Sequence, residues 1–298
     1  MICLKRSLSF IMQAFRSMAC AEEFEMCRAD LKYFVLTCFL TLHACLASPP
    51  TSLNLEQLQR ELHQQTNAFR HEKGLEQLEA LTELNQVSAA QSQDMATRHY
   101  FDHQNPDGQL PNDRLRTQQP GLLAIQNGEN IAMRSWERES PAEMAKTLMK
   151  LWADSPEHYE TMVHPDFWQL GVGFFLKDKV LYATQTFAAV VVRLQDELPA
   201  SVPENTSLKL SFQFHARFPK SELDAFLILP DPSARMPVGD GSSYIGKGPV
   251  RLDWSDESHF SLKLNTRYGL GYYTLLFGRK GNYYDTPFKI LVKKTEGA

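Results

Sequence analysis

The sequence predicts a mixed α/β domain followed by a small all-β domain. In the first two thirds of the chain, apolar residues recur at helical spacing and two strand-like segments follow. Beyond residue 206 only the two-residue alternation of strands remains. The 298 residues are 43% hydrophobic and 22% charged, which is typical of a globular chain with one large or two smaller domains.

Two helices are expected at the start of the α/β domain. Residues 53–73 place an apolar face along one side of a helix that Gly74 ends, and residues 82–99 form the second helix. The apolar face consists of Leu55, Leu58, Leu62 and Phe69. The stretch "NPDG" (105–108) that follows has the residues of a β-turn.

Two more helices are predicted from their start signals. "SPAE" (140–143) is a capping box with proline at the first helical position. Ser155 and Pro156 repeat this signal and open a short helix to about Val163, before Pro165. Residues 171–176 and 180–191 then read as two strands joined by a tight turn.

The C-terminal third is expected to be a β-sandwich. Residues 196–206 are polar, contain two prolines and read as a linker, so the α/β domain is placed at 53–195 and the β domain at 207–298. Turn residues recur between alternating segments. In the first of these segments, Leu208, Leu210, Phe212 and Phe214 face one way.

The N-terminal region has the layout of an export signal. Residues 26–47 combine basic residues, an apolar run too short for a comfortable membrane span, and small residues, which is typical of a signal peptide or lipoprotein signal. Residues 1–25 are interpreted as an upstream extension and 48–52 as a tether. "LHAC" (42–45) resembles a lipobox, so Cys45 is a candidate lipidation site and outer-leaflet membrane tether. Simple cleavage after Ala44 or Ala47 is the alternative. We expect a periplasmic, membrane-anchored or secreted protein.

The composition excludes a nucleic-acid-binding protein and a fold stabilised by disulfides. The formal net charge of −4 gives no basic footprint for a nucleic-acid partner. All five cysteines lie within the first 45 residues, so the folded body has no disulfide framework and no thiol nucleophile.

Three motifs occur in a specific order: "YFDHQNPDG" (100–108), "GENIA" (128–132) and "LWADSPEHYETMVHPDFWQLGVG" (151–173). Together with "YATQTFA" (182–188) they resemble the CAP superfamily, also called the SCP or PR-1-like domain, in its cysteine-free bacterial branch. The resemblance covers roughly residues 60–190 and implies an α-β-α sandwich with a surface cleft.

The resemblance also implies a candidate site. His103, Glu129 and His158 match the two histidines and the acidic residue of the family's cleft, where a divalent metal, often zinc, can lie between the histidines. The fourth position is Ser155, where animal members have glutamate. This serine removes one carboxylate from any mechanism that needs a pair.

The residues support this placement independently. His158 falls in the first turn of a helix, where the positive end of the dipole favours a neutral imidazole. Glu129 follows Gly128, which we interpret as a tight turn, and its carboxylate could orient an imidazole of an open zinc site. Ser155 is expected to accept a capping hydrogen bond from residue 157 or 158, which disfavours a Ser155–His158–Glu129 triad. His164, just before Pro165, is assigned to a turn or to packing.

Three functional hypotheses follow. The favoured one is a non-enzymatic envelope or extracellular binding module for a metal or small ligand such as a lipid. The alternative is a metal-assisted hydrolase acting on peptides or cell-wall material, with Glu129 as base. In the third, the α/β domain is a scaffold and the β domain docks a partner such as a cell-envelope component.

Overall fold

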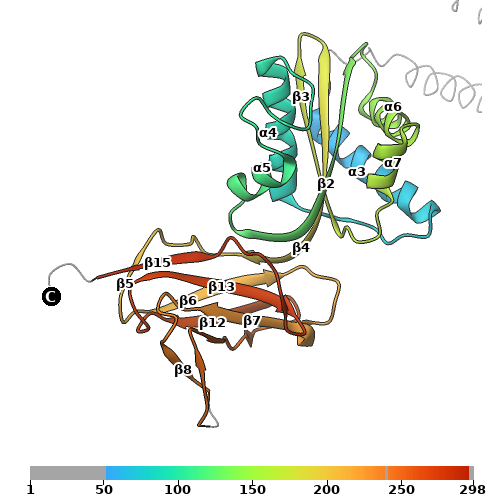
Figure 1. Cartoon of the computed structure of the whole chain (residues 1–298). Helices are drawn as coiled ribbons and strands as arrows, with labels where there is room; N and C mark the ends of the chain where they lie inside the picture. The colour runs from blue at the N-terminus through green and yellow to red at the C-terminus, as the bar shows by residue number, and fades with distance from the viewer. Residues whose placement is uncertain (1–51, 239–240, 295–298) are drawn as a thin grey trace, which may run out of the picture. The chain divides into compact units, whose positions relative to one another are not determined.

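The computed structural model describes residues 52–238 and 241–294 (Figure 1). The signal and extension predicted for residues 1–47, the candidate lipidation site Cys45 and most of the tether lie outside these residues. The described residues belong to one compact unit. Among their helices, none combines the length and the apolarity needed to cross a membrane.

The α/β part contains five helices and four strands between residues 52 and 195. The elements are α3 (Leu55–Glu72), β1 (Glu79–Ala80), α4 (Thr82–Arg98), α5 (Pro111–Gln118), β2 (Leu122–Ser135), α6 (Pro141–Ala153), α7 (Pro156–Met162), β3 (Gln169–Lys177) and β4 (Val180–Leu194).

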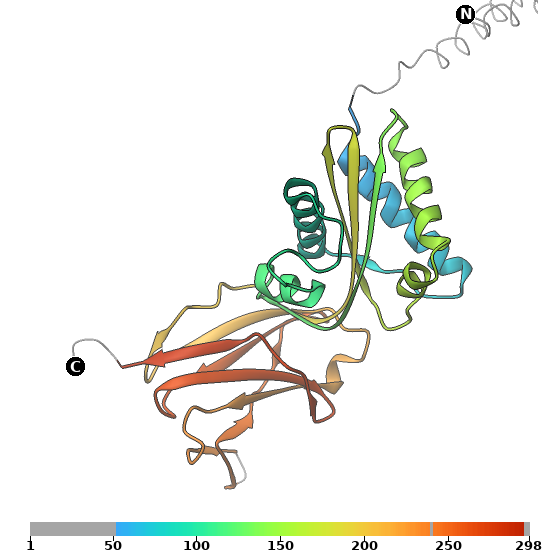
Figure 2. The same cartoon turned by 45° about the horizontal axis from the view of Figure 1, so that its top comes forward.

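These elements form three layers, which confirms the predicted α-β-α sandwich (Figures 1 and 2). The strands lie in the order β1-β3-β4, and β2 pairs with the other edge of β4. Helices α4 and α5 cover one face of the sheet, and α3, α6 and α7 cover the other. A separate apolar core fills each side: Leu84, Val87 and Leu115 belong to the first, and Leu58, Leu148 and Trp152 to the second.

Helix α4 lies directly against β3 because of two glycines. A Cβ atom on Gly171 or Gly173 would collide with the backbone of Leu84 or Ala89 in α4. Because α4 lies this close to the sheet, Ser88 of α4 donates a 2.8 Å hydrogen bond to Thr186 of β4. Small polar side chains therefore join this helix to the sheet. The "GVG" motif is therefore a packing requirement between a helix and a strand.

Several elements were predicted correctly from local sequence signals. The capping box at Ser140 and Glu143 is formed at the start of α6. The predicted turn between the last two strands is present, with Asp178 and Lys179 both at positive φ, as a two-residue hairpin turn requires. Helix α5 and the 14-residue strand β2 were not predicted, although both carry residues of the candidate site.

The C-terminal part is a β-sandwich, as predicted. Its strands are β5 (Val202–Pro203), β6 (Ser207–Phe214), β7 (Leu223–Ile228), β8 (Arg235–Pro237), β9 (Ser243–Ile245), β10 (Lys247–Pro249), β11 (Asp253–Trp254), β12 (His259–Asn265), β13 (Gly271–Arg279), β14 (Asn282–Tyr283) and β15 (Lys289–Lys293), with a short 3₁₀ helix η1 (Lys220–Glu222). Strands β6, β12 and β11 continue the first sheet, and β10-β7-β13-β15-β5 form a second sheet. Phe212 of β6 packs against Phe277 of β13 at 5.0 Å between ring centroids, which joins the two sheets.

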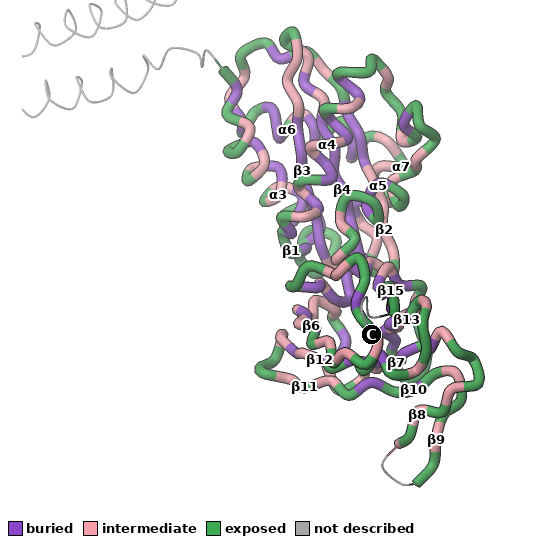
Figure 3. Tube along the Cα trace, turned by 90° about the vertical axis from the view of Figure 1, so that its left-hand side faces the viewer, coloured by how far each residue is buried: buried purple, intermediate pink, exposed green. Residues whose placement is uncertain are grey.

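Strand β4 passes from one part of the chain to the other. Its last three residues, Val192 to Leu194, pair with Phe212 to Phe214 of β6. The strand is buried along most of its length (Figure 3). Residues 196–206, expected to be a linker, contain β5, which pairs with β15. Because β4 and β6 pair directly, the first sheet continues across the proposed boundary between the two domains.

Candidate functional site

His103 lies on a loop that α4 holds in place. Tyr100, at the start of this loop, donates a 2.6 Å hydrogen bond to Asp94, and its hydroxyl also lies 3.2 Å from Oε1 of Gln91. Gln91 in turn donates to the carbonyl of Asp102 at 3.1 Å. Burial and the Asp94 carboxylate raise the pKa of Tyr100, so its hydroxyl stays protonated as a donor. The "YFDH" stretch thus serves to position His103.

The turn after His103 is closed by its own side chains and by an arginine. Asn105 Oδ1 accepts hydrogen bonds from the backbone N–H groups of Asp107 at 3.1 Å and Gln109 at 2.8 Å. Arg114 of α5 donates to the carbonyls of His103 at 2.6 Å and Gln109 at 3.0 Å. Both ends of the turn are therefore fixed to the same guanidinium group.

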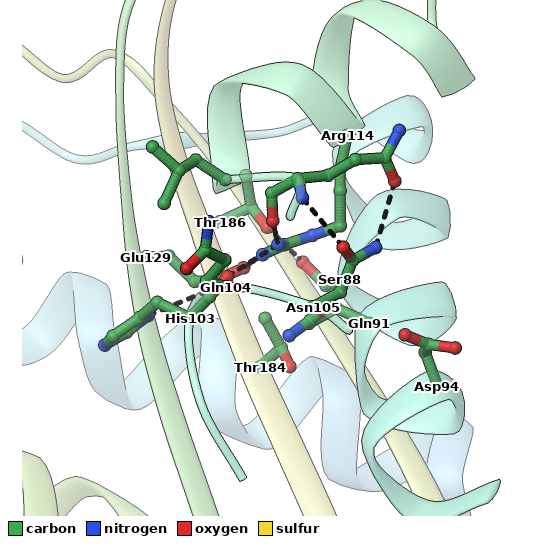
Figure 4. Close-up of polar contacts among 12 residues, drawn as sticks. Ser88, Gln91, Asp94, His103, Gln104, Asn105, Arg114, Glu129, Thr184 and Thr186 are labelled. Atoms are coloured by element: carbon green, nitrogen blue, oxygen red, sulfur yellow. Dashed lines mark hydrogen bonds and ion pairs between the residues drawn. The ribbon is translucent and has the colours of Figure 1, made fainter. Parts of the chain in front are cut away.

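A chain of three side chains forms the centre of the site (Figure 4). Arg114 donates to Oε2 of Glu129 at 2.6 Å, and Oε1 of Glu129 lies 2.8 Å from Nδ1 of His103. The side chains of Arg114 and Glu129 are 2% and 3% exposed, whereas that of His103 is 45% exposed. An ionised carboxylate only accepts hydrogen bonds, so His103 carries its proton on Nδ1 and leaves Nε2 available.

Strand β2 connects this centre to His158. Successive residues of a strand point to opposite faces. Glu129 accordingly points to the α5 side, while Asn130 donates a 3.2 Å hydrogen bond to the carbonyl of His158 on the other side. Gly128 lies against α7, because a Cβ there would meet Phe167 at 2.9 Å and Thr161 at 3.1 Å. The expectation that Gly128 and Glu129 form a tight turn was wrong: they lie within β2, and the glycine permits close packing.

Helix α7 presents His158 in its first turn, as predicted. Ser155 is the N-cap residue, but its side chain makes no capping hydrogen bond, so that expectation was wrong. The cap position is instead fixed through Pro156 at the first helical position and by the backbone N–H of Tyr159 donating to the carbonyl of Ser155 at 2.8 Å. Nδ1 of His158 is buried and has no hydrogen-bond partner among the described residues.

The two histidines have opposite electrostatic environments. The hydrogen bond to Glu129 raises the pKa of His103 against the opposing effect of burial. Burial, and then the nearby charge of His103, lower the pKa of His158. His158 is therefore a neutral imidazole near pH 7, as the first turn of a helix also favours.

The other sequence-predicted residues are placed as follows. His164 is outside the centre: its ring packs on Phe167 at 4.7 Å between centroids, and its carbonyl accepts a 3.0 Å hydrogen bond from Arg70. Ser155 lies on the same helix end as His158 but has no bond to His158 or Glu129 in the described structure.

The side chains of the site can be compared with the ligands that a metal ion requires. Within residues 52–238 and 241–294, no group of three or more His, Cys, Asp or Glu side chains could hold a metal. Two histidines remain, one with a free Nε2 and one with an unpartnered buried nitrogen. Zinc sites in proteins ordinarily have three or four protein ligands, so two imidazoles would need further ligands from water or a bound molecule. The described residues therefore do not form a closed structural metal site of four protein ligands.

Arg114 was not predicted from the sequence, although a signal was present. Pro111 and Asp113 are typical of a first helical turn and would have predicted the short helix that carries it. Its pairing with Glu129, 15 residues away, depends on how α5 folds over β2.

Comparison with known proteins locates the similarity in the α/β part. Residues 63–191 match the family model described as the cysteine-rich secretory protein family, CAP. The uncharacterized protein YkwD of Bacillus subtilis (strain 168) is 32% identical over 127 residues, which are 43% of this chain and 45% of that protein. The chain thus spans less than half the length of this relative.

Solved structures show weaker similarity. An extracellular protein containing a SCP domain from Bacillus anthracis str. Ames is 26% identical with a TM-score of 0.37, and the match covers 45% of this chain and 41% of that one. An outer surface protein from Borrelia burgdorferi is 16% identical with a TM-score of 0.40, over 46% of this chain and 95% of that one.

Proposed function

Because residues 63–191 match the CAP family model, we propose that the protein is an exported binding module of the bacterial envelope or extracellular space. Its site at His103, Glu129 and His158 takes a divalent metal ion, with zinc as the best fit, or a small ligand. A lipid is one example of such a small ligand. The proposal depends on two histidine nitrogens. Nδ1 of His103 is hydrogen-bonded to Glu129, which leaves its Nε2 available, and Nδ1 of His158 has no hydrogen-bond partner among the described residues.

The hydrogen-bond chain supports a ligand role for His103. A carboxylate that accepts from Nδ1 fixes the ring and raises the basicity of Nε2, as is common for metal-binding histidines. The same hydrogen bond raises the pKa of His103, so protons compete with a metal there. We expect metal affinity to fall as the pH decreases through the titration of His103.

His158 supports the proposal through its ring, whose pKa is lowered by burial and then by the nearby charge of His103. A buried nitrogen without a partner is costly unless a partner arrives on binding. Its lowered pKa keeps the ring neutral and able to donate a lone pair. When bound, zinc would supply a Lewis acid that holds an anionic or carbonyl group of a ligand.

The hydrolase alternative finds no support in this geometry. A general base must reach a water or a substrate proton. Glu129 is 3% exposed and each of its oxygens already has a partner, so it is suited to orienting His103. We therefore propose one function for the site and not two.

The test is zinc binding by the purified protein. Wild type, His103→Ala/His158→Ala and the matched control His71→Ala, which removes an exposed histidine on α3, are compared by metal analysis and calorimetry. We expect one zinc per chain in wild type and control, and none in the double variant with an unchanged circular dichroism spectrum. Equal zinc in all three proteins would contradict the proposed site.

Export and anchoring need a separate measurement. Mass spectrometry of the mature protein from its membrane or medium fraction distinguishes a lipidated Cys45 from an unmodified terminus after Ala44 or Ala47. A cytoplasmic protein that keeps residues 26–47 would contradict export.

A further inference from the structure

We propose that the outer face of the second sheet docks onto a membrane surface that carries anionic headgroups. This sheet has the order β10-β7-β13-β15-β5. Its inner face is part of the sandwich core, with Leu227, Leu275 and Ile290 at most 1% exposed. The outer face is made by the alternate residues of the same strands, and it differs from an ordinary solvated sheet face.

The centre of the outer face is apolar. Strand register places Ile228 beside Thr274, Phe226 beside Leu276, and Tyr272 beside Leu291, so these side chains form adjacent rows. Ile228 is 40% exposed and Tyr272 60% exposed. An exposed apolar surface across three paired strands marks an interaction site more often than a solvated face.

Two tyrosines extend this surface. The ring of Tyr283 lies 5.2 Å from that of Phe226, and the ring of Tyr244, from the β8–β9 hairpin, lies 5.4 Å from the same ring. Tyr244 is 42% exposed and Tyr283 37% exposed. Tyrosine combines an apolar ring with a polar hydroxyl, and it is enriched where a protein meets the headgroup region of a bilayer.

Lysines flank the apolar centre on two sides. Lys247 pairs with Ile228 on one side, and Lys289 pairs with Thr274 on the other, so both lie on the outer face. Lys293 follows two residues after Leu291 on the same side of β15. All three are exposed, and none forms an ion pair with a described residue. Basic side chains around an apolar patch are typical of proteins that bind anionic membranes.

The distribution of charge along the chain favours an anionic partner for the β-sandwich and not for the α/β part. Residues 207–298 contain 13 Lys and Arg against 9 Asp and Glu, whereas residues 53–206 contain 13 against 22. An anionic surface therefore attracts the β-sandwich and repels the CAP domain. Aliphatic side chains together with tyrosines favour a lipid surface over a purely polar anionic polymer.

The experiment measures sedimentation of the full-length protein with vesicles of phosphatidylcholine, with and without 30% phosphatidylglycerol, a composition chosen at roughly the charge density of an anionic leaflet. We expect stronger binding to the anionic vesicles than to those of phosphatidylcholine alone, and we expect this difference to shrink as salt is added. Lys247→Glu/Lys289→Glu should reduce it by about thirtyfold or more, and Ile228→Ser/Tyr272→Ser should reduce it at every salt concentration.

The matched control is Lys209→Glu/Lys263→Glu. These two exposed lysines pair across β6 and β12 on the other sheet, and the substitutions change the net charge by the same amount. We expect this control to bind as wild type does. All variants share residues 1–51, so any contribution of that segment cancels.

Three results would overturn the proposal: no sedimentation of wild type with anionic vesicles, an equal loss in the control variant, or binding of wild type to soluble polygalacturonate but not to vesicles. The last result would assign the face to an acidic glycan. Because no variant touches His103 or His158, zinc binding should be unchanged throughout, which separates this test from that of the metal site.

Discussion

The guanidinium of Arg114 donates a 2.6 Å hydrogen bond to the carboxylate of Glu129, and both side chains are almost completely buried. The pair lies between helix α5 and strand β2, and its carboxylate also orients His103. The buried carboxylate of Glu129 therefore has the guanidinium of Arg114 as its counter-charge.

Arg114→Met should destabilise the protein by about 3–5 kcal/mol, because it leaves the Glu129 carboxylate buried without a counter-charge. Urea unfolding measures this loss. The control is Arg116→Met, two residues along the same helix, which removes a 49% exposed side chain paired with an exposed Asp285 and should cost less than about 1 kcal/mol. Equal effects of both substitutions would show that the Arg114–Glu129 pair has no special role.

Glu129→Gln should lower the pKa of His103, because the hydrogen bond to the carboxylate is the main cause of its elevation. Imidazole resonances followed by NMR between pH 5 and 8 measure the shift. In the native state His103 holds its proton more tightly than in the unfolded chain. Its stabilising contribution is therefore fully present below pH about 6.5 and is lost as the pH rises through the folded pKa. An unchanged His103 titration in the variant would mean that another group controls this pKa.

Arg70→Met should cost about 3 kcal/mol or more. The buried Arg70 side chain donates to the carbonyls of Glu76, Met162 and His164, so it fixes the C-terminal end of α7, and burial lowers its pKa to about 10. Losing it leaves the buried carbonyl of Met162 and the partly buried carbonyls of Glu76 and His164 without this donor. Thermal unfolding compares it with Arg60→Met, which removes an exposed arginine of the same helix α3. A small effect, no larger than that of the control, would indicate that water replaces the guanidinium.

Gly173→Ala should destabilise the protein by about 3 kcal/mol, since the added methyl group collides with the backbone of Ala89 and forces α4 away from β3. Gly121→Ala is the control, because a Cβ there lies 3.5 Å from the carbonyl oxygen of Leu194, an ordinary contact distance. Similar melting temperatures for the two variants would contradict the close helix–strand packing described above.

Elements with local signals were predictable from the sequence. Ser140 and Glu143 form their capping box because both partners lie within one helical turn. His158 likewise follows from the start signal at Pro156. The order of the motifs, rather than any one of them, indicated the similarity to the CAP family that residues 63–191 show.

Features that depend on distant residues were not predictable. Gly128 next to Glu129 resembled a turn, but the glycine is required by Phe167 and Thr161, which approach β2 from elsewhere in the chain. Arg114 was missed because its partner is defined by the packing of α5 on β2. Ser155 has the residue type of a cap, yet side-chain type alone does not determine whether the hydroxyl turns toward the helix.

The continuity of β4 limits how this protein can be divided. Val191, Val192 and Leu194 at its end belong to the same apolar core as Phe212, Phe260 and Phe277 of the β-sandwich. A truncation after residue 195 would expose these side chains and an unpaired strand edge, a surface prone to aggregation. The two parts should consequently unfold in a single cooperative transition, and the function of either one is best tested by point substitutions in the intact chain.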